Sequence, residues 1–168
     1  MVGDGDHFHQ EFDTMVYMKT ASPEETSKCK EFLQKNEYAV VATASEGQIP
    51  EAAVVTYVMD NDWNIYFFTH KHTYKHRNLL KNPMIALVVG TGPASTTVQI
   101  NGLAAEISPE ETEQWMDEFL NQRNGFYTTF LKLQGYDFVG YKVAPRRIRW
   151  LEIEAGEENE DQIEVRVT

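Results

Sequence analysis

The sequence predicts a mainly β fold, a small antiparallel barrel with a few peripheral helices. The chain has 168 residues, of which 42% are hydrophobic, and this is the size of one ordinary globular domain. Between two clear helix-start signals, the residues form about six strand-like runs with short connections, a pattern typical of small antiparallel barrels. No apolar run approaches the ~18 residues of a membrane span. We therefore expect a single domain and no association with a membrane.

Helices are predicted from their capping signals. The tetrapeptides Ser22-Pro23-Glu24-Glu25 and Ser108-Pro109-Glu110-Glu111 each combine a capping Ser, a Pro at the first helical position and a Glu that completes a capping box. The first predicts a helix from Pro23 to about Lys35, with Cys29 at an apolar position that indicates a core role. A shorter helix is predicted over Thr73–Lys81, capped by Thr73 and stopped by Asn82-Pro83.

Strands are predicted where apolar, β-branched and aromatic residues run together between turn signals such as Glu46-Gly47 and Asp60-Asn61-Asp62. They cover Tyr38–Ala44, Ile49–Met59, Trp63–His70, Met84–Thr91, Thr96–Ile107 and Phe138–Ile153. The last is either a strand pair or one long strand interrupted at Pro145. Residues 126–133 resemble another short helix. We divide the chain into an arm (1–20), the barrel domain (21–153) and an acidic tail (154–168), which reads as solvated or as an edge strand.

The charge distribution indicates a small anionic ligand. The net charge is −11, which disfavours nucleic-acid binding because that binding depends on cations that neutralise phosphates. From Trp63 to Ala105 there is no Asp or Glu, yet this segment contains Lys71, Lys75, Arg77 and Lys81. Its charge is therefore +4, which leaves −15 on the remainder. With a single cysteine and no apolar leader at the N-terminus, we expect a cytoplasmic protein.

The acid-free segment contains a candidate phosphate site. Between Phe68 and Leu79 a strand is expected to end and a helix to begin, with Thr73 as its cap and Lys75 in its first turn. Free backbone N–H groups and the helix dipole favour an anion at such a terminus. The alternative is that these cations only face solvent on an amphipathic helix. A metal site at His70, His72 and His76 is disfavoured because four cations and no carboxylate lie nearby, so we predict none.

The residues resemble a known family. The stretch IYFFTHKHTYKHRNLLKNPMIALVVG is similar to the central signature of the pyridoxamine 5'-phosphate oxidase-like, FMN-binding split-barrel superfamily. The likeness continues in AVVATASEGQIPEAAVVTYV, VQINGLAAEI and VGYKVAPRRIRWLEI, so it covers about Glu37 to Ile153. It implies a six-stranded antiparallel split β-barrel that forms a homodimer, with FMN at the interface.

The resemblance also assigns cofactor-binding positions. It implies that the backbone at Val54 and Val55 lines the isoalloxazine ring, that the strand end at Phe68 and Thr69 meets the flavin, and that Thr73 and Lys75 hold the phosphate. Thr97 stands where the oxidase has a flavin-contacting Gln, and Gln99 follows on the same strand face.

Some positions depart from the family pattern. Ala53 replaces an Arg that holds the phosphate in the oxidase, and Arg77 is a candidate substitute. Val58 replaces the substrate-binding Lys, and the C-terminal Arg-x-His motif is absent, so pyridoxamine phosphate is not the expected substrate. Trp150 lies one position before the family's flavin-contacting Trp, which turns it to the other strand face unless a bulge intervenes.

These observations together predict an FMN-dependent oxidoreductase. We expect it to transfer a hydride or electrons between a reduced nicotinamide nucleotide and a small-molecule substrate that the sequence does not assign. Its catalytic residues are not assigned, because the chemistry belongs to the flavin. Two alternatives stay open: a non-catalytic protein that binds or sequesters flavin or haem, and a deazaflavin-dependent reductase of the same fold.

Overall fold

The computed structural model describes residues 19–90, 96–121, 137–152 and 161–165. The helices are α1 (Pro23–Lys35), α2 (Tyr74–Leu79) and α3 (Pro109–Asn121). The strands are β1 (Lys19–Thr20), β2 (Tyr38–Ala44), β3 (Pro50–Met59), β4 (Ile65–His70), β5 (Met84–Val89), β6 (Thr96–Glu106), β7 (Phe138–Glu152) and β8 (Asp161–Val165). The helix expected over residues 126–133 lies outside the described residues.

Both predicted capping boxes are present. In α1 the Ser22 hydroxyl accepts a hydrogen bond from the Glu25 N–H at 3.2 Å, and the Glu25 carboxylate accepts one from the Ser22 N–H at 2.7 Å. Ser108 and Glu111 repeat the arrangement at the start of α3. The reciprocal bonds satisfy N–H groups that have no partner within the helix, which explains why each helix begins at the predicted residue.

The strands form a closed six-stranded antiparallel barrel, which confirms the predicted fold. The sheet order is β7-β4-β3-β2-β5-β6, and β6 pairs with β7 to close it. One edge of β7 pairs with two different strands. Residues 138–143 pair with β4, and residues 148–152 pair with β8. The barrel therefore opens along β7, where the long β6–β7 ladder continues beyond β4.

The last barrel strand is one long strand with a bulge. Asn101 pairs with Arg147 and Gly102 pairs with Pro145, so Arg146 has no cross-strand partner. A β-bulge of this kind shifts the inward–outward alternation of the strand by one residue. Beyond it Trp150 faces the core and packs edge-on against Phe32 of α1, with ring centroids 5.5 Å apart.

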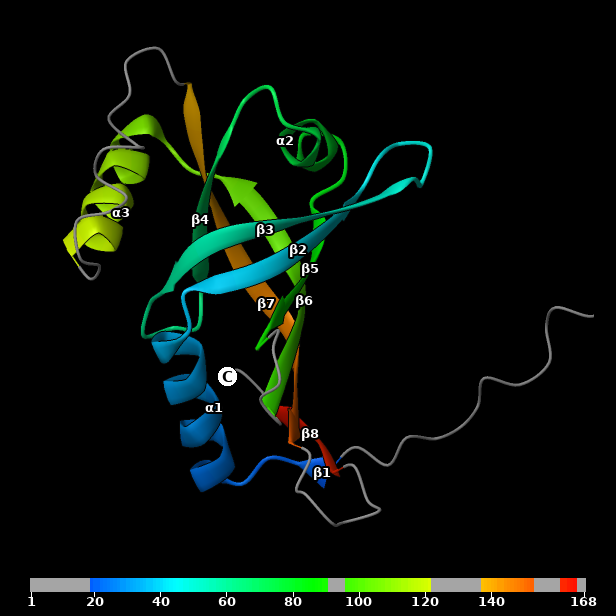
Figure 1. The fold of residues 1–168 in the computed structure, drawn as a ribbon, viewed down its shortest axis with the longest axis vertical. Helices are drawn as coiled ribbons and strands as arrows, with labels where there is room; N and C mark the ends of the chain where they lie inside the picture. The colour runs from blue at the N-terminus through cyan, green and yellow to red at the C-terminus, as the bar shows by residue number, and fades with distance from the viewer. Residues whose placement is uncertain (1–18, 91–95, 122–136, 153–160, 166–168) are drawn as a thin grey trace, which may run out of the picture.

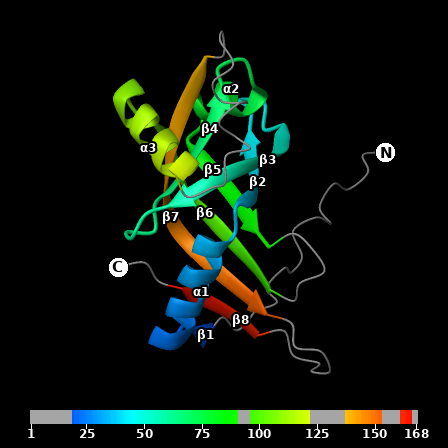
Figure 2. The same ribbon diagram turned by 60° about the vertical axis from the view of Figure 1, so that its left-hand side comes forward.

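Helices cover the barrel at three places (Figures 1 and 2). α1 lies at one end near β8, and α2 lies at the other end against β2 and β3. α3 lies along the outside of β4 and β7, where Phe119 joins a second apolar cluster with Val58 and Tyr66. The main core fills the barrel and includes Cys29, which is fully buried as predicted. In the described part of the chain, no helix is long and apolar enough to cross a membrane.

Parts of the predicted arm and tail belong to the sheet. β8 pairs antiparallel with β7, and β1 pairs in parallel with β8. Ile163 and Val165 of β8 are buried members of the main core cluster. Residues 161–165 therefore form a strand near the edge of the sheet, with β1 beyond it. The division of the whole chain into arm, domain and tail stays a prediction.

Candidate functional site

The N-terminus of α2 is anchored to the barrel. β4 ends at His70, whose carbonyl accepts hydrogen bonds from both the N–H and the hydroxyl of Thr73, at 3.1 and 2.9 Å. The Thr73 hydroxyl in turn accepts from the His76 N–H and caps the helix, as predicted. Further along α2, His76 Nδ1 lies 2.8 Å from the Tyr141 hydroxyl, and the Asn78 amide donates to Thr43. These buried contacts fix the orientation of the first turn of α2.

A cavity of about 250 Å³ lies beside this first turn. Its described lining consists of Val41, Glu51, Ala52, Ala53, Thr73, Tyr74 and Lys75. The cavity therefore lies between the first turn of α2 and the paired strands β2 and β3. Ala53, which stands where the oxidase has a phosphate-binding Arg, faces the same space as Lys75.

Lys75 is a half-buried cation. Its Nζ donates to the Thr69 hydroxyl at 3.4 Å, and that hydroxyl lies 3.1 Å from the Thr73 hydroxyl. Burial lowers the pKa of the Lys75 ammonium. Among the residues that the structure describes, no carboxylate oxygen forms an ion pair with Lys75. An ammonium held in this way, beside two hydroxyls and a helix N-terminus, is suited to an anion such as a phosphate.

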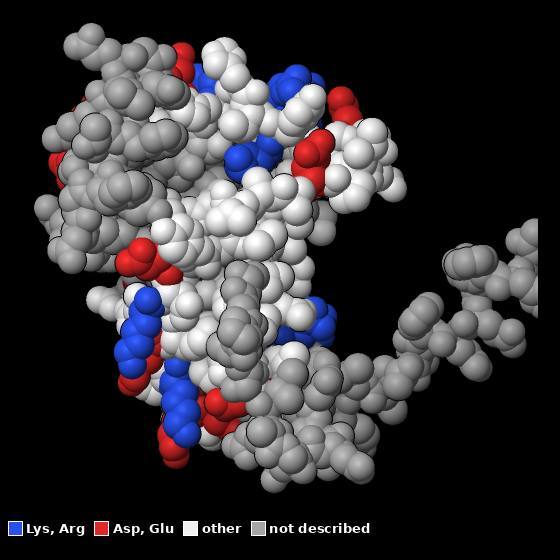
Figure 3. All heavy atoms as spheres, in the orientation of Figure 1, with Lys and Arg blue, Asp and Glu red and all other residues white. Residues whose placement is uncertain are grey.

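The outer face of β3, β2 and β5 carries a row of apolar side chains. Register places Val54, Val40 and Val88 side by side across β3, β2 and β5, with Gln99 of β6 next in the row. Val54 is 67% exposed and Met84 is 66% exposed. The surface over β2 and β3 is mostly uncharged, and charged side chains lie along α1 and around α2 (Figure 3). A flat aromatic ring system requires a surface of this kind.

The structure gathers some of the predicted residues and separates others. Thr69, Thr73 and Lys75 lie together beside the cavity. Val54 points outward, whereas Val55 is buried in the core. Their cofactor contacts stay predictions.

The other candidates lie away from the described lining of the cavity. Phe68 packs against Phe119 of α3. The Arg77 guanidinium lies over the Tyr74 ring, with its Cζ 4.4 Å from the ring centroid. Thr97 and Gln99 lie on β6, three strands from β3 in the sheet order. Their roles toward a cofactor also stay predictions.

Sequence reasoning did not single out two residues of this region. Glu51 contributes a carboxylate to the cavity lining, and its position two residues before Ala53 on one strand face was the available signal. Arg149 donates from Nη2 to the Gln99 side-chain oxygen at 2.5 Å. No local pattern indicates this contact, because the two residues are 50 positions apart in the chain.

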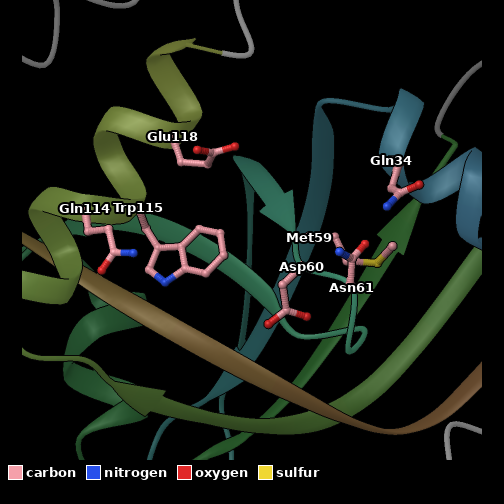
Figure 4. A pocket seen from close by; sticks show the side chains of 7 residues that line it. All are labelled: Gln34, Met59, Asp60, Asn61, Gln114, Trp115 and Glu118. Carbon is pink, nitrogen blue, oxygen red and sulfur yellow. The ribbon is translucent and has the colours of Figure 1, made fainter.

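A second cavity, of about 330 Å³, lies between α1, α3 and the β3–β4 turn (Figure 4). It is lined by Trp115 and Glu118 from α3 and by Asp60 and Asn61 from the turn, together with amide side chains. The Trp115 ring stacks on Tyr66, with centroids 3.8 Å apart. Its described lining has two carboxylates and no Lys or Arg, so it does not suit an anion, and it contains none of the predicted site residues.

The histidines near α2 point in different directions. His76 contacts Tyr141 inside the barrel, and the His70 ring lies against Phe138, with centroids 4.3 Å apart. Across the described ranges, no three His, Cys, Asp or Glu side chains are grouped so that they could hold a metal ion.

An antiparallel barrel that opens along one long strand, with a cavity at a helix N-terminus, resembles the pyridoxamine 5'-phosphate oxidase-like split barrels. The comparison with protein families agrees. The family model described as "Pyridoxamine 5'-phosphate oxidase" matches residues 25–158. The chain therefore belongs to this family.

One curated relative and one solved structure carry the name of the same enzyme. The chain is 27% identical to the pyridoxine/pyridoxamine 5'-phosphate oxidase of Ehrlichia ruminantium (strain Welgevonden), over 67% of this chain and 65% of that protein. A putative pyridoxamine 5'-phosphate oxidase from Listeria innocua is 25% identical, with a TM-score of 0.59, and the match covers 74% of this chain and 96% of that one. The chain spans slightly less than two thirds of that curated relative.

Other solved structures share the fold and carry different names. The heme storage protein HutZ from Vibrio cholerae is 17% identical, with a TM-score of 0.62 over 73% of this chain and 91% of that one. A protein named F420 reductase is 20% identical, with a TM-score of 0.57 over 71% of this chain and 94% of that one. At these identities the likeness shows the fold alone.

Proposed function

We propose that this protein binds FMN non-covalently and is an FMN-dependent oxidoreductase that acts on a small molecule. The observation that carries the proposal is Lys75: a half-buried ammonium that points to Thr69 beside a cavity at a helix N-terminus. Thr73 and Lys75 would hold the phosphate, and the apolar face around Val54 would support the ring. A bound flavin supplies the capacity to accept and donate a hydride or electrons, so no acid–base pair is needed from the chain.

The expected homodimer is also part of the proposal. The outer face of β3, β2, β5 and β6 exposes large apolar side chains, including Val54 and Met84, and exposed apolar patches are a common feature of protein interfaces. Thr97 and Gln99 lie about 14 Å from β3 across the sheet, at about 4.8 Å for each strand. A second copy that packs on this face would cover it and would bring its own Thr97 and Gln99 to the flavin.

Pyridoxamine phosphate is not the substrate that we propose. Val58, at the position of the oxidase's substrate-binding Lys, is buried in the cluster that contains Tyr66 and Phe119. A substrate could contact the side chain at position 58 only if α3 moved. We propose instead that a reduced nicotinamide nucleotide supplies the reducing equivalents to a different small acceptor.

Titration with FMN and with riboflavin tests the proposal. The two ligands differ only in the phosphate, so the ratio of their dissociation constants measures the phosphate pocket separately from the ring site. We expect FMN to bind stoichiometrically and more tightly than riboflavin, with the flavin absorption bands retained after gel filtration. Bleaching of these bands by a reduced nicotinamide nucleotide supports the oxidoreductase proposal.

The same protein should be titrated with haem and with a deazaflavin. A Soret band at stoichiometric haem with no FMN binding would replace the proposal by haem binding, the activity in the name of the Vibrio cholerae neighbour. Tight binding of the deazaflavin alone would favour the second alternative, for which the neighbour named F420 reductase is the precedent.

A further inference from the structure

Arg149 of β7 lies on the outer face of the sheet, directly beside Gln99. The register pairs the two residues across β6 and β7, and Arg149 Nη2 donates to the Gln99 side-chain oxygen. Trp150 faces the core, so its neighbours Arg149 and Leu151 face outward. A residue that the family resemblance places at the flavin is thus engaged by a guanidinium from the next strand.

The guanidinium of Arg149 is incompletely paired. Its Nε is buried and has no hydrogen-bond partner, and a buried donor without a partner destabilises the folded state. Glu164 lies opposite Arg149 on β8, but its carboxylate forms an ion pair with Arg147, with Nε and Oε1 3.4 Å apart. In the described part of the chain, no carboxylate forms an ion pair with Arg149. Folding therefore holds a cation at this point that forms no ion pair with the carboxylate opposite it.

This cation lies at the end of a row of outward-facing residues. Val54, Val40 and Val88 form an apolar strip across three strands, and Gln99 and Arg149 follow at its end. An isoalloxazine ring has an apolar dimethylbenzene end and a pyrimidine end that bears carbonyl oxygens and ring nitrogens. In the homodimer proposed above, the apolar strip of one copy would face the first end, and the donors of Gln99 and Arg149 of the second copy would face the second end.

We propose that Arg149, oriented by Gln99, is a further cofactor-binding residue, which contacts the pyrimidine edge of the flavin ring held by the second copy of the homodimer. The inference rests on the proposed FMN binding and extends it. A positive charge at this edge stabilises the reduced, anionic ring relative to the oxidised, neutral ring, and so raises the midpoint potential of the bound flavin.

The test compares the full-length wild type with Arg149→Gln and Arg149→Lys. The control is Arg146→Gln, which removes the same charge from the exposed bulge of β7. We expect Arg149→Gln to weaken FMN and riboflavin by the same factor, about tenfold or more, because the ring is common to both ligands. We also expect a lower midpoint potential, partial rescue of both by Arg149→Lys, and no change in the control.

Three results overturn the inference. If Arg149→Gln leaves both affinities and the potential unchanged while the wild type binds FMN, the inference is wrong and the proposed function stands. If the wild type binds no flavin, both are wrong. If Arg149→Gln lowers the affinity for FMN but not for riboflavin, Arg149 contacts the phosphate and not the ring. Should Arg149→Gln fail to fold, Arg149→Met keeps the side-chain stem and is measured in the same way.

Discussion

Replacement of Lys75 by Met should remove the preference for FMN over riboflavin. Lys75 is the cation that the structure places beside the cavity with Thr73, and its Nζ is held by the Thr69 hydroxyl. Met keeps the length and apolar volume of the stem and removes only the charge and the donors. The perturbation therefore acts on the phosphate contact and leaves the apolar face that would hold the ring unchanged.

The magnitude follows from the environment of Lys75. A hydrogen bond to a charged group contributes about 1.5–3 kcal/mol. At about 1.4 kcal/mol for each tenfold change, the affinity for FMN should fall by about 10- to 150-fold. The affinity for riboflavin should not change. Burial lowers the pKa of Lys75, so its charged form is disfavoured by folding, and the protein without ligand should be as stable as the wild type or slightly more stable.

Isothermal titration with both flavins, together with thermal unfolding of the ligand-free protein, measures these quantities. Lys71→Met is the matched control, because Lys71 is nearby in sequence but lies 3.7 Å from Asp137 in an exposed ion pair. The reasoning is refuted if the ratio of the dissociation constants of FMN and riboflavin is the same for Lys75→Met as for the wild type. It is equally refuted if Lys71→Met has the larger effect.

Three further predictions concern folding. The N–H of Ser22 lowers the pKa of Glu25 from 4.5 to about 2, so the carboxylate stabilises the protein above about pH 4.5 and loses this effect as the pH falls toward 2. The difference in melting temperature between wild type and Glu25→Gln should therefore be present at pH 7 and vanish near pH 2. Burial raises the pKa of Cys29 to about 12, so iodoacetamide should not modify the folded protein at pH 8 and should react on unfolding in urea. Gly102→Ala should destabilise the protein by about 1–3 kcal/mol in urea titrations, because its Cβ would lie 2.5 Å from the Ala144 carbonyl oxygen; unchanged stability would contradict this.

Much of the fold was predictable because its signals are local. The helix predicted from Pro23 to about Lys35 and the strand predicted over Tyr38–Ala44 match the structure to the residue. Capping boxes, turn residues and apolar runs act over a few positions, so one sequence contains them in full. The grouping of Thr69, Thr73 and Lys75 was predictable for the same reason, because these residues lie within seven positions of one another.

The features that the sequence did not reveal depend on distant pairing. A Pro at position 145 indicated an interruption of the last strand, but the bulge at Arg146 depends on where β6 pairs with β7. This bulge decides that Trp150 faces the core and that Arg149 faces outward. Hydrophobic periodicity within one strand cannot predict the shift, because the extra residue is defined only relative to the partner strand.

The two candidate flavin contacts share one physical property. Lys75 and Arg149 are both partly buried cations, and neither forms an ion pair within the ranges that the structure describes. A chain of net charge −11 has ample carboxylates with which to pair them, as Arg147 shows with Glu164. Leaving these two cations without a carboxylate reduces stability, and departures of this kind concentrate at sites that bind ligands. The segment from Trp63 to Ala105 therefore supplies cations and no carboxylate to the anion cavity, and the carboxylate in its described lining, that of Glu51, comes from β3.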